Sequence, residues 1–318
     1  MTASAPASAS ANAYLNAPDP EGPLDVVPVG GRIGAEVRGV RLGADLDDAT
    51  LAAVRAALVR HKVLFFRDQG HLDDVGHEAF GKRFGTPVAH PTVPSRGGDF
   101  LLELDSQLGG RANHWHTDVT FVDGYPFASI LRAVTIPPAG GDTVWANTAA
   151  AYQNLPEELR LLADRLRAIH TNAYDYATVR PEANERELAL HRHIFASTVY
   201  EAEHPLVRVH PESGERSLLL GAFLKRIVGL SASESQRIYD ILQGYVIRLE
   251  NTVRWRWKEG DVVIWDNRAT QHYAIDDYGD QHRVVRRVTL DGETPVGVDG
   301  RPSRQILPEP VAFQEAAE

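Results

Sequence analysis

Short β-like runs lie on both sides of a long, partly helical middle section, and few folds accommodate that order. The first group occupies residues 100–147 and reads FLLELD, HWHTDVTF, ASILRAV and DTVWAN, with Gly and Pro between the runs. The second group occupies residues 251–290 and reads NTVRWRW, DVVIWDN and RVVRRVTL, the first two joined by a turn at residues 258–260. Short strands separated by turn residues are typical of β-sandwiches and barrels. We therefore expect one sheet system that closes across the middle section.

Helical patterns surround these runs. An acidic cap at Asp47, followed by apolar residues at helical spacing, predicts a helix up to residue 62. The apolar run VLFFRDQ comes next and is typical of a buried strand. Ser231 and Glu234 form a capping box at the start of another helix. Further helices are expected at residues 74–84, 148–170 and 181–195.

The domain organisation follows from changes in composition. Residues 1–23 are rich in Ala, Ser, Pro and Asn without apolar periodicity, which indicates a disordered leader. We expect residues 24–318 to form one catalytic domain, in which the part after about residue 300 loses periodicity and packs loosely. Length alone does not decide the number of domains, because β-sandwiches and barrels often exceed 200 residues.

Composition excludes several classes of function. The chain has no cysteine, which excludes disulfide frameworks, thiolate metal sites, iron–sulfur clusters and cysteine nucleophiles. A net charge of −10 gives no long-range attraction for nucleic acid or anionic lipid, so an anionic substrate must be held by local arginines. No apolar run approaches the roughly 20 residues that span a membrane. Without a signal-peptide pattern at the start, the expected location is the cytoplasm.

A possible metal site lies in NHWHTDVTF. His116 and Asp118 stand two positions apart, and a strand would point both side chains to the same face. A His-x-Asp pair alone is common on surface strands. A facial triad of two histidines and one carboxylate needs a second imidazole and leaves three metal positions open for cosubstrate and oxygen. His272, in DNRATQHYA, is the candidate for that imidazole; its alternative interpretation is a hydrogen-bonded histidine at a strand end.

Three other histidines and two arginines are further candidates for binding a metal or an anion. His114 precedes His116 by two residues and stays possible as a ligand, but we interpret it as structural or exposed, together with two histidines in an Arg-rich helical stretch, His191 and His193. Arg283 and Arg287 share one face of the last strand, about 13 Å apart at roughly 3.3 Å per residue. Guanidinium groups bind carboxylates and sulfates through paired hydrogen bonds, so a dicarboxylate cosubstrate and an anionic substrate would account for both. The alternative is a surface ladder of salt bridges.

The motifs WHTDVTF, GGDT and WDNRATQH and the arginines that follow them resemble the taurine dioxygenase family of iron(II)/2-oxoglutarate enzymes. The resemblance runs from about Gly31 to Leu290. It implies a mainly β fold with flanking helices, namely a double-stranded β-helix or jelly-roll related to cupins. It also implies an inserted helical lid, expected between about His170 and His204.

The resemblance further implies the roles of individual residues. His116, Asp118 and His272 would be the catalytic iron(II) ligands. Thr143 and Arg283 would bind the distal carboxylate of 2-oxoglutarate. Arg287, helped by His90, would hold the sulfate or sulfonate of the substrate.

Two positions depart from the taurine-specific pattern. Val93 and Ala112 stand where taurine enzymes place a Tyr and an Asn for the substrate amine, which favours an apolar tail at this substrate-binding site. The segments RIGAEVRGVRLGADLD and VWANTAAAY look closest to the alkyl sulfatase branch. The expected reaction uses O2 to hydroxylate the carbon that bears the sulfate of a small anionic organosulfur substrate, and yields aldehyde, sulfate, succinate and CO2.

Alternatives remain open for the substrate and for the assembly. A sulfonate or taurine-type substrate would release sulfite, and Arg287 would serve a carboxylate equally well by charge. A non-catalytic cupin-like binding protein would not need Thr143 and Arg283. Family likeness implies a homo-oligomer, either a dimer or a tetramer.

Overall fold

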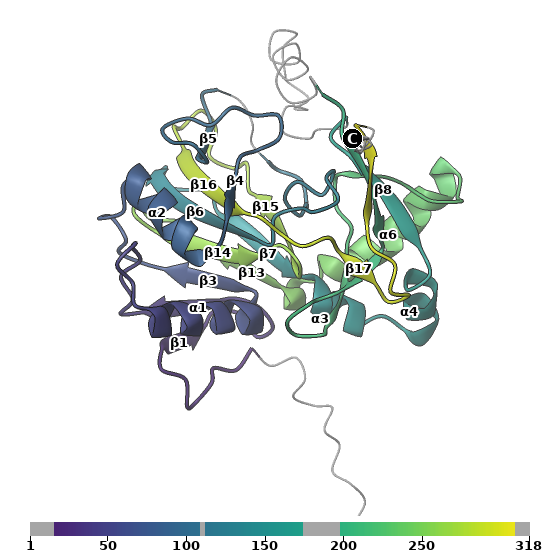
Figure 1. The fold of residues 1–318 in the computed structure, drawn as a ribbon, viewed down its shortest axis with the longest axis horizontal. Helices are drawn as coiled ribbons and strands as arrows, with labels where there is room; N and C mark the ends of the chain where they lie inside the picture. Colours follow the sequence, from purple (N-terminus) through teal and green to yellow (C-terminus); the bar gives the residue numbers. More distant parts are fainter. Residues whose placement is uncertain (1–15, 109–111, 174–197, 309–318) are drawn as a thin grey trace, which may run out of the picture.

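The computed structural model describes residues 16–108, 112–173 and 198–308. Within these ranges the protein is mostly β, with helices on the outside of the sheets (Figure 1). The predicted helix at residues 181–195 and most of the predicted lid lie outside the described residues. No helix in the described part of the chain has the length and hydropathy to cross a membrane.

The largest sheet has eight strands in the order β1–β2–β3–β14–β6–β16–β4, and β5 also pairs with β16. All neighbours are antiparallel except β2 and β3. The strands are Asp25–Pro28 (β1), Ala35–Arg38 (β2), Val63–Phe66 (β3), Pro87–Val88 (β4), Leu102–Asp105 (β5), Ala128–Thr135 (β6), Val262–Asp266 (β14) and Val284–Leu290 (β16).

Three smaller sheets complete the β structure. One has the order β13–β7–β15, one β12–β8–β9–β18, and one β11–β10–β17. Their strands are Thr252–Trp255 (β13), Thr143–Asn147 (β7), Thr270–Ala274 (β15), Leu224–Ile227 (β12), Arg167–Thr171 (β8), Glu201–Pro205 (β9), Arg304–Leu307 (β18), Arg216–Leu218 (β11), Val207–Val209 (β10) and Val296–Gly297 (β17).

Two helices begin at the caps that the sequence predicts. Asp47 accepts a hydrogen bond from the backbone N–H of Thr50, and Ser231 and Glu234 form the complete capping box. The helices are Asp48–His61 (α1), Asp74–Phe84 (α2), Thr148–Gln153 (α3), Glu157–Ala163 (α4), Ala232–Val246 (α6) and the 3₁₀ turn Leu249–Asn251 (η1). The predictions for α1, α2 and α6 are confirmed.

Strand β3 shows why its sequence lacks polar alternation. Val63 and Phe65 face the sheet β13–β7–β15 and pack in a cluster that includes Trp145. Leu64 and Phe66 point the other way and pack with residues of α1 and α2. All four side chains are buried, because the large sheet is covered on both faces here. The cluster around Trp145 also includes Trp265, whose ring lies 4.8 Å from that of His272.

Several local predictions are wrong. HWHTDVTF is not a strand: His116 makes an isolated β-bridge to His272, and a turn follows from residue 118, with Val119 at φ +56°. The segment 148–170, predicted as helix, ends in β8. The turn predicted at residues 258–260 is present, but the strands that it joins lie in different sheets, because β13 pairs with β7 while β14 joins the large sheet. In each case the segment pairs with a strand that is distant in the sequence, so local periodicity does not predict the pairing.

Both ends of the described chain pack more tightly than predicted. Asn16, within the predicted leader, is buried, and its side-chain amide donates to the carbonyls of Gly30 and Gly34. Residues 304–307, within the predicted loose tail, form β18 on the edge of β9. Ser303, just before that strand, is buried against His204.

Buried neutral histidines predict a loss of stability in mild acid. Burial is the main cause that lowers the pKa of His61 to about 4, of His77 to about 3 and of His204 to about 4. An unfolded histidine titrates near 6.5, so between pH 6.5 and about 4 the unfolded chain binds more protons than the folded one. The free energy of unfolding should therefore fall as the pH drops through this window, by about 1.4 kcal/mol per pH unit for each histidine. Urea midpoints of the metal-free protein at neutral and mildly acidic pH measure this; equal midpoints would contradict it.

Candidate active site

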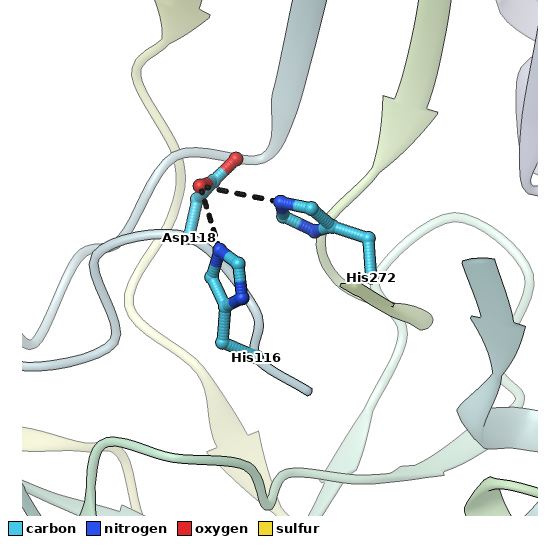
Figure 2. Close-up of side chains that lie close together, drawn as sticks. All are labelled: His116, Asp118 and His272. Carbon is cyan, nitrogen blue, oxygen red and sulfur yellow. Dashed lines mark ion pairs between the residues drawn. The ribbon is translucent and has the colours of Figure 1, made fainter. Parts of the chain in front are cut away.

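Three side chains that are far apart in the sequence meet in one buried cluster. One ligand atom from each of His116, Asp118 and His272 lies within 4.8 Å of the others, and all three side chains are buried. Nε2 of each histidine lies 3.8 Å from Oδ1 of Asp118. The two imidazole rings are 4.0 Å apart between centroids, and both turn toward the carboxylate (Figure 2).

A short piece of antiparallel pairing brings this cluster together. The backbone N–H of His116 donates to the carbonyl of His272 at 3.1 Å, and the reverse bond measures 2.8 Å. His272 lies on β15, so the segment around His116 extends the three-stranded sheet by one bridge. The turn that follows places Asp118 beside the two rings. His116 and Asp118 lie close together, but a bridge and a turn bring them together where a strand was expected.

The protonation of the three groups suits a divalent metal. Burial lowers the pKa of His116 to about 4 and that of His272 well below its usual range, so both imidazoles are neutral at pH 7. Nδ1 of His116 lies 2.7 Å from the carbonyl of His114, which leaves Nε2 as the metal-binding nitrogen of the neutral ring. Burial would raise the pKa of Asp118, but the charge of Arg287, the two neighbouring histidines and the hydrogen bond from Ser129 together outweigh burial and hold that pKa well below the ordinary value. Two neutral imidazoles and one carboxylate form the donor set of a facial-triad iron(II) site.

A chain of hydrogen bonds orients the carboxylate. Ser129 on β6 donates to Oδ2 of Asp118 at 2.7 Å, and the Asn267 amide donates to the Ser129 hydroxyl at 3.0 Å. The indole of Trp265 in turn donates to Asn267 at 2.9 Å. Oδ2 is thus occupied from the large sheet, while Oδ1 faces the two imidazoles.

Removal of the Ser129 hydroxyl is expected to weaken metal binding. Partners that orient a ligand typically contribute about 10–100-fold to metal affinity. We expect Ser129→Ala to lower the affinity for Mn(II), an inert stand-in for iron, by about that factor in an anaerobic titration. Thr135→Ala, near the other end of the same strand, is the matched control. Parental affinity in Ser129→Ala would show that the hydroxyl does not orient the ligand.

Thr143 and Arg283 lie on either side of a glycine turn. Thr143 begins β7, and its hydroxyl accepts from the indole of Trp257 at 3.0 Å, which leaves the hydroxyl hydrogen available for another acceptor. Arg283 is buried, and its Nε donates to the carbonyl of Gly141 at 3.0 Å. No carboxylate in the described part of the chain comes within ion-pair distance of Arg283. A buried guanidinium of this kind suits the carboxylate of a bound ligand.

Arg287 lies next to the metal ligands. It is buried, and its Nη1 forms an ion pair with Oδ1 of Asp118. Its Nε is buried without a hydrogen-bond partner among the residues that the structure describes. Arg286 points to the opposite side of β16, where it pairs with Asp74 and Glu103. The alternative of a surface ladder of salt bridges, considered for Arg283 and Arg287, is therefore wrong, because both side chains are buried.

His90 adds a neutral donor to the same region. Burial first, and then the charge of Arg287, lower the pKa of His90 to about 3. Its Nδ1 accepts from the backbone N–H of Val93 at 3.0 Å, so the proton of the neutral ring is on Nε2. An anion between His90 and Arg287 would then be met by one charged and one neutral donor.

An aromatic cluster borders the metal ligands. The Phe121 and Phe223 rings are 5.0 Å apart, and the Phe223 ring stands edge-on to His116 at 6.1 Å. Phe121 also lies 6.1 Å from both His90 and Tyr200. A continuous set of ring contacts thus runs from the metal ligand His116 through Phe223 and Phe121 to His90.

The other predicted residues have different surroundings. Val93 contacts His90 through its backbone, and the carbonyl of Ala112 accepts from the backbone N–H of Ala274 at 3.1 Å. Both side chains are half-buried, which leaves their role at the substrate a prediction. His114 is exposed. His191 and His193 lie outside the described residues.

Sequence reasoning missed the residues that support the site. Ser129 is a polar residue near the start of a mostly apolar strand, and this difference in polarity is the feature of the sequence that could have indicated its role. Trp257 stands in a segment predicted only as a strand, and Asn267 stands in the WDNRATQH motif, where the sequence analysis assigns no role to it. The aromatic pair Phe121 and Phe223 gave no signal, because its members meet only through the fold.

Known proteins are similar to this chain in sequence over most of its length. The model of the family described as taurine catabolism dioxygenase TauD, TfdA family matches residues 25–289. An alpha-ketoglutarate-dependent sulfate ester dioxygenase from Pseudomonas putida is 67% identical over 282 residues, which cover 88% of this chain and 94% of that protein. An alkylsulfatase from Acinetobacter baylyi is 56% identical over 286 residues, 90% of each protein.

Solved structures are similar over most of the chain. A taurine dioxygenase from Burkholderia xenovorans has a TM-score of 0.75 at 42% identity and covers 91% of this chain and 96% of its own. AAD-2, solved with Mn(II) and N-oxalylglycine, has a TM-score of 0.70 at 26% identity, covering 86% of this chain and 98% of its own. These likenesses confirm the predicted jelly-roll fold class.

Proposed function

The chain belongs to the taurine dioxygenase TauD/TfdA family, and from this premise we propose that it oxidises alkyl sulfate esters. It is an iron(II)- and 2-oxoglutarate-dependent dioxygenase that also consumes O2. The observation that carries the sulfate ester is the identity of 67% and 56% to a sulfate ester dioxygenase and an alkylsulfatase, each over most of the chain. Taurine dioxygenase is a more distant relative in structure, at 42% identity.

The reaction balances without a nucleophilic side chain. An alkyl sulfate, 2-oxoglutarate and O2 give an aldehyde, inorganic sulfate, succinate and CO2. One oxygen atom enters the succinate and the other hydroxylates the carbon that bears the sulfate. That carbon then carries both hydroxyl and sulfate, and it collapses to the aldehyde as the C–O bond to sulfate breaks.

Each residue of the site has a proposed role. His116, Asp118 and His272 hold iron(II), which supplies the oxidising chemistry for the C–H bond. Arg283 and the Thr143 hydroxyl bind the distal carboxylate of 2-oxoglutarate. The support for this pair is the buried guanidinium without a carboxylate partner among the described residues, together with a hydroxyl whose acceptor side is already used by Trp257.

The substrate anion is proposed to bind between Arg287 and His90. Both donors lie beside the metal ligands, so an anchored sulfate would keep its own carbon near the metal. Phe121 and Phe223, with Val93 and Ala112, would meet the alkyl tail. Apolar residues at these positions would favour a hydrocarbon over an aminoalkyl group, because they cannot pair with an amine.

The test is a balance of products. Protein loaded anaerobically with iron(II) is mixed with 2-oxoglutarate and O2 and with medium-chain alkyl sulfates, alkyl sulfonates, taurine or aryloxyacetates in turn. Succinate, sulfate and sulfite are then separated by ion chromatography. Succinate matched by sulfate is the expected result. Sulfite in its place would move the substrate to sulfonates, and succinate with neither anion would move it to carboxylates.

Three broader features are part of the same proposal. Residues 24–318 are proposed to act as one catalytic jelly-roll domain after a leader at residues 1–23. The enzyme is proposed to be a homo-oligomer, either a dimer or a tetramer, by likeness to its family. A cytoplasmic location is proposed because the cosubstrate 2-oxoglutarate is a metabolite of that compartment. Light scattering of the purified protein tests the oligomer.

A further inference from the structure

The turn between β6 and β7 meets Arg283 directly. Gly140 and Gly141 both have positive φ, at +79° and +71°, and Thr143 follows at the start of β7. A Cβ atom on Gly141 would lie 3.0 Å from Cδ of Arg283, so the guanidinium stem packs against bare backbone. The Gly141 carbonyl accepts from Arg283 Nε at 3.0 Å. The position of this turn therefore sets the spacing between the Thr143 hydroxyl and the Arg283 guanidinium.

A carboxylate from the loop after β15 holds the other side of the turn. Oδ1 of Asp277 accepts from the backbone N–H of Gly141 at 2.7 Å. Arg254 on β13 donates to Asp142 in the same turn at 2.6 Å, and its Nη2 lies 3.7 Å from Oδ2 of Asp277. Gly141 is thus bonded on one side to Asp277 and on the other to Arg283.

We expect these outer residues to contribute little to global stability. The side chains of Asp277 and Arg254 are 44% and 55% exposed. Exposed ion pairs typically contribute about 0–1 kcal/mol to folding. If these residues served stability alone, replacing them would change the free energy of unfolding only slightly. If they place the turn, replacing them would change the affinity for the ligand that Thr143 and Arg283 bind.

We propose that Asp277, braced by Arg254, is a positioning residue for 2-oxoglutarate, because it holds the Gly140–Asp142 turn against Arg283. This inference rests on the proposed function, in which Thr143 and Arg283 bind the distal carboxylate of the cosubstrate. Asp277 does not touch the cosubstrate. It keeps the two donors at the spacing that one carboxylate requires, and an error of about 1 Å in such placement can cost about 100-fold.

The test compares three variants of the full-length, metal-loaded protein. Asp277→Ala removes the acceptor of the Gly141 N–H, whereas Asp277→Asn keeps a side-chain oxygen there. Asp280→Ala is the matched control, because Asp280 is an exposed carboxylate on the same loop and makes no hydrogen bond or ion pair to another residue in the described ranges. N-oxalylglycine, an unreactive analogue of 2-oxoglutarate, is titrated anaerobically by calorimetry into each Mn(II)-loaded protein.

We expect Asp277→Ala to bind N-oxalylglycine about 10–100-fold more weakly than the parent, and to raise the KM for 2-oxoglutarate with little change in kcat. Asp277→Asn should bind close to the parent, and Asp280→Ala should bind like the parent. Metal affinity and the urea midpoint should stay at parental values in all three. Equal weakening by Asn and Ala, or a matching loss of metal affinity, would overturn the positioning role.

A fourth variant separates this inference from the function on which it rests. Arg283→Ala should lose most binding of N-oxalylglycine if that residue receives the distal carboxylate. Parental binding in Arg283→Ala would refute the proposed cosubstrate site itself. Weak binding in Arg283→Ala together with parental binding in Asp277→Ala would leave that site standing and refute the role of Asp277.

Discussion

Asp118→Ala is expected to lower metal affinity and metal-dependent turnover by more than about 100-fold. Loss of a residue that only supports a metal ligand costs up to about 100-fold, and loss of the ligand itself should cost more. The carboxylate is the only anionic group among the three clustered side chains. Without it, two neutral imidazoles face the positive charge of Arg287 in a buried site, and a dication would gain no compensating charge there. Titration of the metal-free protein with Mn(II), together with succinate formation under iron(II), measures both effects.

A matched control shows whether the effect belongs to the metal. Asp123→Ala removes a half-buried carboxylate five positions further along the same loop; among the residues that the structure describes, that carboxylate accepts only from the backbone of Gly124. It should keep metal affinity near the parental value. If Asp118→Ala bound Mn(II) as tightly as Asp123→Ala, the assignment of the three ligands would be wrong.

Arg287→Ala is expected to weaken binding of the organic anion while 2-oxoglutarate still binds. Loss of one partner of a buried charged pair typically costs about 2–5 kcal/mol, which is roughly 30-fold or more in affinity. Without an anchored substrate, 2-oxoglutarate should still be consumed, so that succinate forms without a matching amount of sulfate. The ratio of succinate to sulfate at a fixed alkyl sulfate concentration measures this uncoupling.

The contact between Arg287 and Asp118 makes a second measurement necessary. Because Arg287 also neutralises the metal ligand, its loss should leave Mn(II) affinity equal or greater while substrate affinity falls. Arg286→Ala is the control: it removes the neighbouring arginine, which faces Asp74 and Glu103 on the other side of β16. Unchanged coupling in Arg287→Ala, or equal uncoupling in Arg286→Ala, would move the anion site elsewhere.

Much of the regular structure could be predicted from local patterns. The caps at Asp47 and Ser231 are local hydrogen bonds between residues three apart, so the sequence around each cap contains both partners. The run at residues 63–66 is buried on both faces, and its continuous apolar character is the direct trace of that burial. The alternation of Arg286 and Arg287 across β16 follows from the two-residue period of a strand.

The site was predicted in its residue types but not in its construction. Motifs indicated His116, Asp118 and His272, and the structure brings them together. The expected reason, a shared strand face, is wrong. A strand of that kind would need a partner along its whole length, whereas here a single bridge to β15 ends at a turn.

Residue types and their local order restricted the metal and marked many of the elements: the chain offers histidines and carboxylates but no cysteine as metal ligands, and caps and periodicity mark helices and buried strands. The assignment of the reaction came from motifs that resemble a known family. Which residues meet was decided only by the folded chain. Three contacts join segments that are distant in the sequence: the bridge between His116 and His272, the hydrogen bond from Ser129 to Asp118, and the hydrogen bond from Gly141 to Asp277. Such contacts depend on how the sheets pack around a common core, and no short-range pattern of polarity records that packing.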